Sequence, residues 1–198
     1  MDLDPRLGGL LLVDKPAGVT SHAVTQQVLH AFAAAFPQLR SRRRRGGGPA
    51  DMRFRTGHAG TLDPLATGLL LVLLGRASRL VPFLVGLDKT YLATVRFGAA
   101  TDTLDSDGEV TATAPPPATV DEALAALPRF HGPQLQAPPV YSALKRDGRT
   151  LHSLARAGLD VPEPDPRPVT VHALRATGAR WEGPAPELDL EVACSSGT

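Results

Sequence analysis

The chain has 198 residues, 42% of them hydrophobic and 21% charged, which is enough apolar material for one folded domain and excludes wholesale disorder. A formal charge of +1 does not by itself indicate a nucleic-acid or membrane partner. The single cysteine, Cys194, excludes an internal disulfide and a cysteine-based metal cage, and is typical of a reducing compartment. We find no secretory signal, and the longest apolar run, 69–74, is too short to span a membrane, so we expect a cytoplasmic protein without a membrane partner.

The first part of the chain predicts two strands and two helices. A short apolar run closed by turn residues predicts a buried strand over 10–13. A helix begins after Thr20 or Ser21, shows apolar residues at helical spacing and stops at Pro37. The sequence "GLLLVLLG", 68–75, predicts a fully buried strand, and 77–86 predicts a short helix.

Between these elements lies a basic, glycine-rich segment, 38–55, with seven arginines, a third of all basic residues. It has no hydrophobic period, so we expect a positively charged loop. The run Arg42, Arg43, Arg44 and Arg45 has two interpretations. It either contacts phosphates without regard to sequence or is a solvated loop with no specific role.

The second part of the chain predicts mainly antiparallel strands. Alternation predicts a half-buried strand over 90–98 and a pair of antiparallel strands over 169–181 and 187–197, the last with an unpaired edge. Helices are expected over 120–130 and 151–158, and 161–168 is expected to be an extended linker. Strands and helices mix without a βαβ rhythm, which predicts an α+β fold with a mainly antiparallel sheet flanked by helices and loops.

The segment "GHAGTLDPLATG", 57–68, leads into the apolar run 68–75 and contains one carboxylate, that of Asp63. An Asp-Pro pair often begins an ordinary turn, and His58 beside glycines is more often a loop residue than a ligand. However, the segment lacks the mixed polarity of a surface turn and abuts a strand that must be buried. We therefore expect Asp63 to be partly desolvated, as functional carboxylates often are.

These residues carry a family resemblance. "GHAGTLDPLATGLLLVLLGRASRL" closely resembles the catalytic motif of the TruB family, the tRNA pseudouridine-55 synthases. "GLLLVDKPAGVTSH", "DKTYLATVRFGAATDTLDSDG", "PPVYSALKRDGRTLHSLARAG", "VTVHALRATG" and "LEVACSSGT" are similar to further family segments, in order and over nearly the whole chain. A different branch of pseudouridine synthases, which acts on ribosomal RNA, is less similar to this chain in the segments "TLDPLATG" and "PPVYSALK".

The resemblance implies the pseudouridine synthase catalytic fold, a tRNA T-arm substrate, no metal or redox cofactor, and action as a monomer. Asp63 matches the family's essential aspartate, His58 the histidine that fills space opened by base flipping, and Tyr91 the tyrosine that stacks on the target uracil. RNA contacts are expected at Arg79 and Asp105. Lys145, Arg146 and Arg149 either touch the RNA backbone or face solvent. Lys15, in the opening motif, is expected to be structural.

The resemblance also implies that 1–198 is an incomplete catalytic domain. The family's arginine that pairs with the aspartate, a tyrosine beside it and the C-terminal RNA-binding domain would all lie beyond Thr198. We therefore expect this polypeptide to have little or no turnover by itself. A non-catalytic RNA-binding or RNA-folding module is the alternative.

The acidic loop "TLDSDGEVTATA" fails as a calcium site because Thr103 starts it and Ala114 occupies the position of the bidentate glutamate. The remaining histidines show no ligand spacing.

Deleting residues 41–49 tests the arginine run. If these arginines pair with phosphates, the slope of log affinity for tRNA against log salt should flatten by roughly 0.9 for each phosphate that is no longer neutralised. Filter binding or fluorescence titration over a range of salt concentrations measures this slope. An unchanged slope would support the solvated loop.

Overall fold

The structure, a computed structural model, describes residues 8–37, 55–137, 145–146, 149–150 and 165–198, and divides into two compact units. Unit 1 comprises residues 1–87 and unit 2 residues 88–198. Each combines an antiparallel sheet with helices, which confirms the predicted α+β class. Within the described part of the chain, no helix is long and apolar enough to span a membrane.

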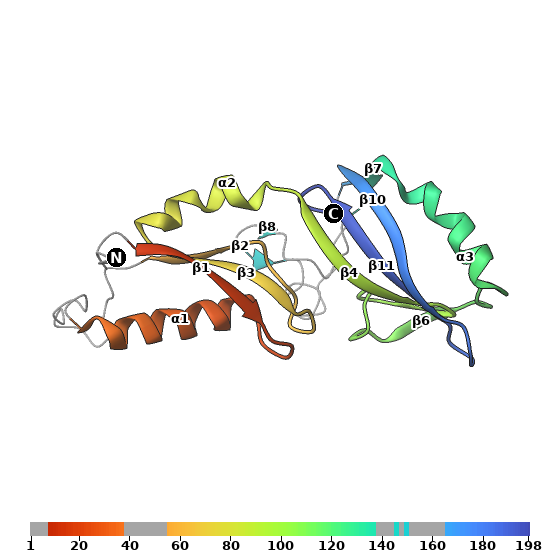
Figure 1. The fold of residues 1–198 in the computed structure, drawn as a ribbon, viewed down its shortest axis with the longest axis horizontal. Coiled ribbons are helices and arrows are strands. Elements are labelled where there is room, and N and C mark those ends of the chain that lie inside the picture. The colour runs from red at the N-terminus through yellow and green to blue at the C-terminus, as the bar shows by residue number, and fades with distance from the viewer. Residues whose placement is uncertain (1–7, 38–54, 138–144, 147–148, 151–164) are drawn as a thin grey trace. The chain divides into compact units, whose positions relative to one another are not determined.

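Unit 1 is built on a three-stranded antiparallel sheet (Figure 1). Its order is β1 (Gly8–Lys15), β3 (Gly68–Gly75) and β2 (Thr56–Ala59), so β3 is central. The long helix α1 (Ser21–Ala35) lies on one side, and the 3₁₀ helix η2 (Arg76–Leu80) with α2 (Val81–Val85) lies on the other. The histidine of the motif, His58, lies in a strand and not in a loop, because residues 56–59 pair with β3.

Helix α1 begins as the sequence predicts. Thr20 is the N-cap, and its hydroxyl accepts a hydrogen bond from the Ala23 amide at 3.0 Å. Val24, 4% exposed, packs against the fully buried Leu70 and Val72 of β3. The helix ends at Ala35, two residues before Pro37. The packing of Val24 makes one face of the sheet the core of unit 1.

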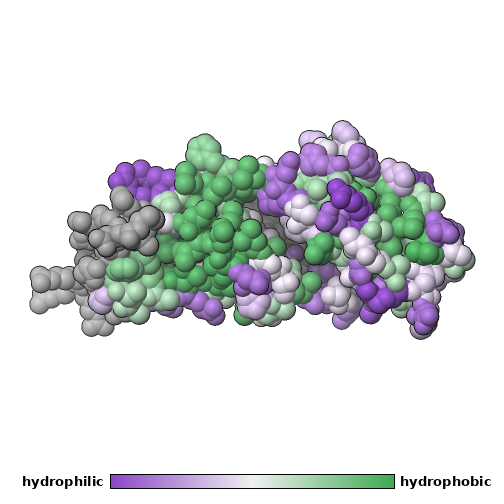
Figure 2. Space-filling model, in the orientation of Figure 1, coloured by the Kyte–Doolittle hydropathy of each residue, from purple (hydrophilic) through white to green (hydrophobic). Residues whose placement is uncertain are grey.

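The prediction that the run 68–75 is fully buried was wrong, and so was the predicted burial of the strand over 10–13, whose Leu10, Leu11 and Leu12 are exposed. Leu70, Leu73 and Leu74 are buried, but Leu69 is 63% exposed, and Leu12 on the neighbouring strand β1 is 69% exposed. Figure 2 shows apolar residues gathered at the surface over this sheet. Successive residues of a strand face opposite sides, and α1 covers only one of them at this end. A continuous apolar run therefore does not imply burial on both faces.

Unit 2 is built on a four-stranded antiparallel sheet in the order β4 (Lys89–Arg96), β11 (Glu187–Cys194), β10 (Arg167–Arg180), β7 (Gly132–Gln136). The predicted antiparallel pair near the end of the chain is confirmed as β10 and β11. The expected unpaired edge of the last strand was wrong, because β11 pairs with both β10 and β4. Strand β7 was not predicted, and β10 begins inside the expected linker.

The remaining elements of unit 2 are short. They are β5 (Ala99–Thr101) with β6 (Val110–Thr113), α3 (Val120–Ala126) with the 3₁₀ helix η3 (Leu127–Phe130), and β8 (Lys145–Arg146) with β9 (Arg149–Thr150). Helix α3 and η3 confirm the helix expected over 120–130. The helix expected over 151–158 lies outside the described residues.

Helix α3 covers the middle of the sheet of unit 2. Ala123 packs against Leu188 and Leu190 of β11, and all three are buried. Strand β4 is confirmed as a strand but not as half-buried, because nearly all its residues are exposed. In the described part of unit 2, β4 pairs with β11 alone, so β4 forms an edge of this sheet and one side of the strand has no neighbouring strand.

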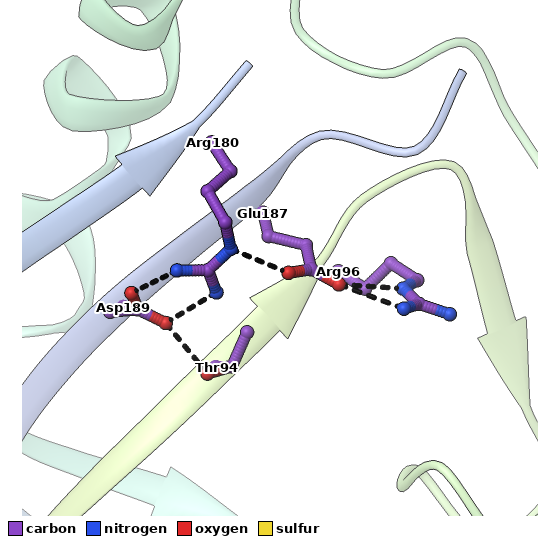
Figure 3. A network of polar contacts seen from close by, with 5 residues as sticks. All are labelled: Thr94, Arg96, Arg180, Glu187 and Asp189. Carbon is purple, nitrogen blue, oxygen red and sulfur yellow. Dashed lines mark hydrogen bonds and ion pairs between the residues drawn. The ribbon is translucent and has the colours of Figure 1, made fainter. Parts of the chain in front are cut away.

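A network of charged side chains joins three strands of this sheet (Figure 3). The Arg180 guanidinium of β10 donates two hydrogen bonds to the Asp189 carboxylate, at 2.6 and 2.8 Å, and one to Glu187 at 2.9 Å. Arg96 of β4 donates to Glu187 at 2.8 Å, and the Thr94 hydroxyl donates to Asp189 at 2.7 Å. The bidentate pair and the shared carboxylate cross-link side chains of β4, β11 and β10, whose register is set by their backbone ladders.

This network lowers the pKa of both carboxyl groups. Hydrogen bonds from Arg180, and then from Thr94, lower the pKa of Asp189 from 3.8 to about 2. Hydrogen bonds from Arg96 and Arg180 lower the pKa of Glu187. Both groups lie at the surface, so the effect is sensitive to salt.

Removing the Asp189 carboxylate should make the stability of the fold less dependent on pH at acid pH. The folded pKa of Asp189, about 2, lies below its ordinary value of 3.8, so the unfolded chain is protonated first as the pH falls. The stabilisation is therefore complete above about pH 4 and is lost between about pH 4 and pH 2. As the pH falls over this interval, the melting temperatures of Asp189→Asn and Arg180→Gln should each decrease less steeply than that of the parent. Parent-like steepness in both variants would contradict the role of the network.

Candidate functional site

The loop from residue 60 to 67 joins β2 to β3 and carries Asp63. The side chain of Asp63 is exposed, so the expected partial desolvation was wrong. The physical reason is that burial in β3 begins only at Leu70, while the loop lies before the strand and is not covered in unit 1. The Ala66 amide donates to the Asp63 backbone carbonyl at 3.1 Å, which closes a tight turn that begins at Asp63.

A buried ammonium group holds the residue that follows Asp63. Lys15, at the end of β1, is 0% exposed. Its Nζ donates hydrogen bonds to the carbonyls of Val19 at 2.8 Å, Pro16 at 3.0 Å and Pro64 at 3.2 Å. An ammonium group has three N–H donors, and all three find acceptors here. Because an unsatisfied buried charge is very costly, this arrangement strongly favours one geometry of the loop. The structural role expected for Lys15 agrees with this position.

The opening turn adds a backbone contact to the same carbonyl. Gly18 has φ of +82°, in the left-handed region that favours glycine, and its amide donates to the Pro64 carbonyl at 2.8 Å. Pro64 has a restricted φ, and it also biases the preceding Asp63 toward an extended backbone. Two donors from the segment 15–18 therefore fix the position of Pro64.

The residue that precedes Asp63 is held from a different element. The Ser21 hydroxyl, in the first turn of α1, hydrogen-bonds both the carbonyl and the amide of Leu62, at 2.8 and 2.9 Å. The side chain of Leu62 packs against the core around Val24, Leu70 and Val72. Asp63 is thus an exposed carboxylate between two anchored neighbours. Neither Ser21 nor Gly18 was predicted from the sequence to anchor this loop, and Ser21 was considered only as a helix cap.

His58 lies on β2, a few residues before Asp63, and is half-buried. Its Nδ1 lies 3.1 Å from the Gly60 carbonyl. A carbonyl only accepts, so Nδ1 carries the hydrogen in this contact and Nε2 remains for another partner. The contact fixes the orientation of the ring relative to the loop.

The other candidate residues lie elsewhere. Arg79 is exposed in η2 of unit 1. Tyr91 and Asp105 belong to unit 2, and their expected contacts with RNA stay predictions. Tyr91, 37% exposed, lies on β4 opposite Val192. Asp105 accepts hydrogen bonds from the Thr103 hydroxyl and the Asp107 amide at 2.6 and 3.0 Å, so its carboxylate orders its own loop.

Several predicted RNA contacts lie outside what the structure describes. Residues 42–45 are among the residues that it does not describe. Lys145 and Arg146 form β8, and Arg149 begins β9, where only the backbone is described. Among the described histidines, cysteines and carboxylates, no group of three or more could hold a metal ion.

Comparison with known proteins gives consistent results. Residues 50–198 match the sequence profile of the TruB family pseudouridylate synthase, N-terminal domain. The chain is 44% identical over 190 residues to tRNA pseudouridine synthase B of Aromatoleum aromaticum, covering 96% of this chain and 54% of the relative. It is 42% identical over 199 residues to the protein of the same name from Opitutus terrae, covering 99% and 73%. The chain spans about half the length of most of these curated relatives.

Solved structures resemble the fold. A crystal structure of a Cbf5-Nop10-Gar1 complex aligns with a TM-score of 0.59 and 23% identity, covering 98% of this chain and 41% of that chain. An H/ACA ribonucleoprotein bound to a substrate RNA containing 2′-deoxyuridine aligns with a TM-score of 0.54 and 20% identity, covering 98% and 39%. At these identities the likeness establishes the fold, and it confirms the expected architecture.

Replacing Lys15 by Met should destabilise unit 1. The apolar side chain fits a buried position, but the carbonyls of Pro16 and Val19 lose their charged donor. We expect a loss of about 1–3 kcal/mol in the free energy of unfolding, measured by urea denaturation. Arg79→Met, which removes an exposed cation in the same unit, is the control and should change it by less than about 0.5 kcal/mol. Equal effects of the two substitutions would contradict the anchoring role.

Proposed function

Because the chain belongs to the TruB family of pseudouridylate synthases, we propose that the protein isomerises uridine 55 in the T-loop of tRNA to pseudouridine. The curated relatives named tRNA pseudouridine synthase B support this substrate. The observation that carries the proposal is the exposed carboxylate of Asp63, held between two anchored residues in the segment that matches the family's catalytic motif. We further propose that the protein works in the cytoplasm as a monomer, without a metal or membrane partner.

The reaction needs access to a base that is normally stacked. The bond between N1 of uracil and C1′ of the ribose breaks, the ring turns, and C5 joins C1′. N1 gains a proton and C5 loses one, so the overall change is an isomerisation. The base must leave the RNA stack at a cost of a few kcal/mol. An accessible side chain on a rigid loop can reach such an extruded nucleotide.

Asp63 is proposed to act at the sugar, as a nucleophile at C1′ or as a base. Its flanking residues are fixed by Lys15 and Ser21, so the carboxylate is presented with little freedom of the backbone. The proline that follows it restricts the chain further.

Two aromatic or heterocyclic side chains are proposed to handle the RNA. Tyr91 would stack on the extruded uracil, a contact that contributes on the order of 1–3 kcal/mol per base. Its exposure on an edge strand is compatible with that role. His58, oriented by the Gly60 carbonyl, would occupy the space that the flipped base leaves. Arg79, Asp105, Lys145 and Arg42–Arg45 are proposed to contribute weaker contacts with RNA.

Asp63→Asn tests the proposal in the full-length protein. The amide keeps the size and position of the side chain but lacks the charge and basicity that the reaction needs. We expect pseudouridine formation on a tRNA T-arm to fall by at least about 1000-fold, with the dissociation constant for the RNA within about threefold of the parent. Asp121→Asn, in the first turn of α3, is the control.

Two results would argue against this function. Ordinary turnover by Asp63→Asn would exclude Asp63 as the catalytic residue. RNA binding without turnover in the parent protein would support the non-catalytic RNA-binding module.

A further inference from the structure

Ser21 is used in a way that its position in a helix does not require. It is the first residue of α1, but Thr20 already provides the N-cap. Ser21 is 2% exposed, and its hydroxyl reaches a residue 41 positions away in the sequence. A buried serine at a helix start whose hydroxyl does not cap the helix serves another contact.

That contact satisfies both backbone groups of one residue. The Ser21 Oγ donates to the Leu62 carbonyl at 2.8 Å and accepts from the Leu62 amide at 2.9 Å. A hydroxyl can do both at once because it has one donor and two acceptor lone pairs. Ser21 thus replaces a neighbouring strand for the residue immediately before Asp63, where the chain has left β2 and has not yet entered β3.

Ser21 is itself held in place by its surroundings. The Thr25 hydroxyl, 3% exposed, donates to the Ser21 carbonyl at 2.8 Å. One helical turn from Ser21, Val24 anchors α1 to Leu70 and Val72 of β3. The hydroxyl is therefore fixed relative to the sheet, and it transmits that rigidity to Leu62.

We propose that Ser21 is a positioning residue for the carboxylate of Asp63. This inference rests on the proposed function, since it assigns the purpose of the contact to catalysis. Lys15 and Gly18 hold Pro64 on one side of Asp63, and Ser21 holds Leu62 on the other. An exposed side chain is not positioned by packing contacts of its own, so its position depends on the backbone of the two neighbouring residues. Removing one anchor allows the carboxylate to shift, and a misplacement of about 1 Å can cost about 100-fold in rate.

The test compares Ser21→Ala with Ser78→Ala in the full-length protein. Ser78, half-buried in η2 of the same unit, also donates a hydroxyl hydrogen bond to a backbone carbonyl, that of Gly75 at 2.8 Å. Each substitution removes one buried or half-buried hydroxyl, but only Ser21→Ala frees the residue before Asp63. Three quantities are measured: the single-turnover rate of pseudouridine formation, the dissociation constant for a T-arm RNA, and hydrogen exchange of the Leu62 amide.

Ser21→Ala should lower the single-turnover rate by about 10- to 100-fold while the dissociation constant stays within about twofold. The Leu62 amide should exchange at least about 10-fold faster, because its acceptor is gone. Ser78→Ala should leave the rate and the Leu62 exchange near those of the parent. If Ser21→Ala does not fold, Ser21→Cys keeps a side chain of similar shape, weakens both hydrogen bonds, and should show smaller changes in the same direction.

The outcomes separate this inference from the proposed function. Unchanged Leu62 exchange in the folded variant, or faster exchange with a parent-like rate, would overturn the role of Ser21. A loss of RNA affinity that accounts for the whole loss of rate would overturn it as well. A parent protein that forms no pseudouridine would refute the proposed function. Leu62 exchange would then still decide whether Ser21 holds the loop.

Discussion

The buried ammonium group of Lys15 is the interaction on which the candidate site depends. A charge that is 0% exposed is tolerable only when all its donors are satisfied, and here they bond to three carbonyls, one of them from Pro64. Pro64 is far from Lys15 in the sequence, so this hydrogen bond ties the 60–67 loop to the end of β1. If Pro64 moved away from the Lys15 Nζ, one N–H donor would be left unpaired inside unit 1, and the cost of that unpaired donor keeps the loop in one position.

This constraint explains how a carboxylate can be exposed and still well placed. Functional carboxylates are often sought among desolvated groups with strained environments, but Asp63 is accessible and its backbone supplies the order. Leu62 is anchored in the core and by Ser21, and Pro64 by Lys15 and Gly18. Such an arrangement suits the reaction proposed above, in which a nucleotide of a macromolecule comes to the protein surface.

Unit 2 achieves its order by different means. Its core is a helix packed on a sheet, through Ala123, Leu188 and Leu190. Three of the four strands of that sheet, β4, β11 and β10, are joined by the network around Arg180, Asp189 and Glu187, which lies at the surface and depends on pH. Tyr91 lies on β4, at an edge of the described sheet, so the backbone register of β4 with β11 determines where the tyrosine is presented.

The sequence alone determined the features that depend on neighbouring residues. Helical spacing located α1, strand alternation located β10 and β11, and the composition around Asp63 together with the family resemblance identified the candidate carboxylate. Only the tertiary structure decided what covers each residue. Leu69 is exposed within an apolar run, Asp63 is exposed although it abuts a buried strand, and the strand order leaves β4 at an edge. The anchoring of Leu62 by Ser21 also escaped the sequence, because burial and long-range hydrogen bonds depend on chain segments that local patterns do not relate.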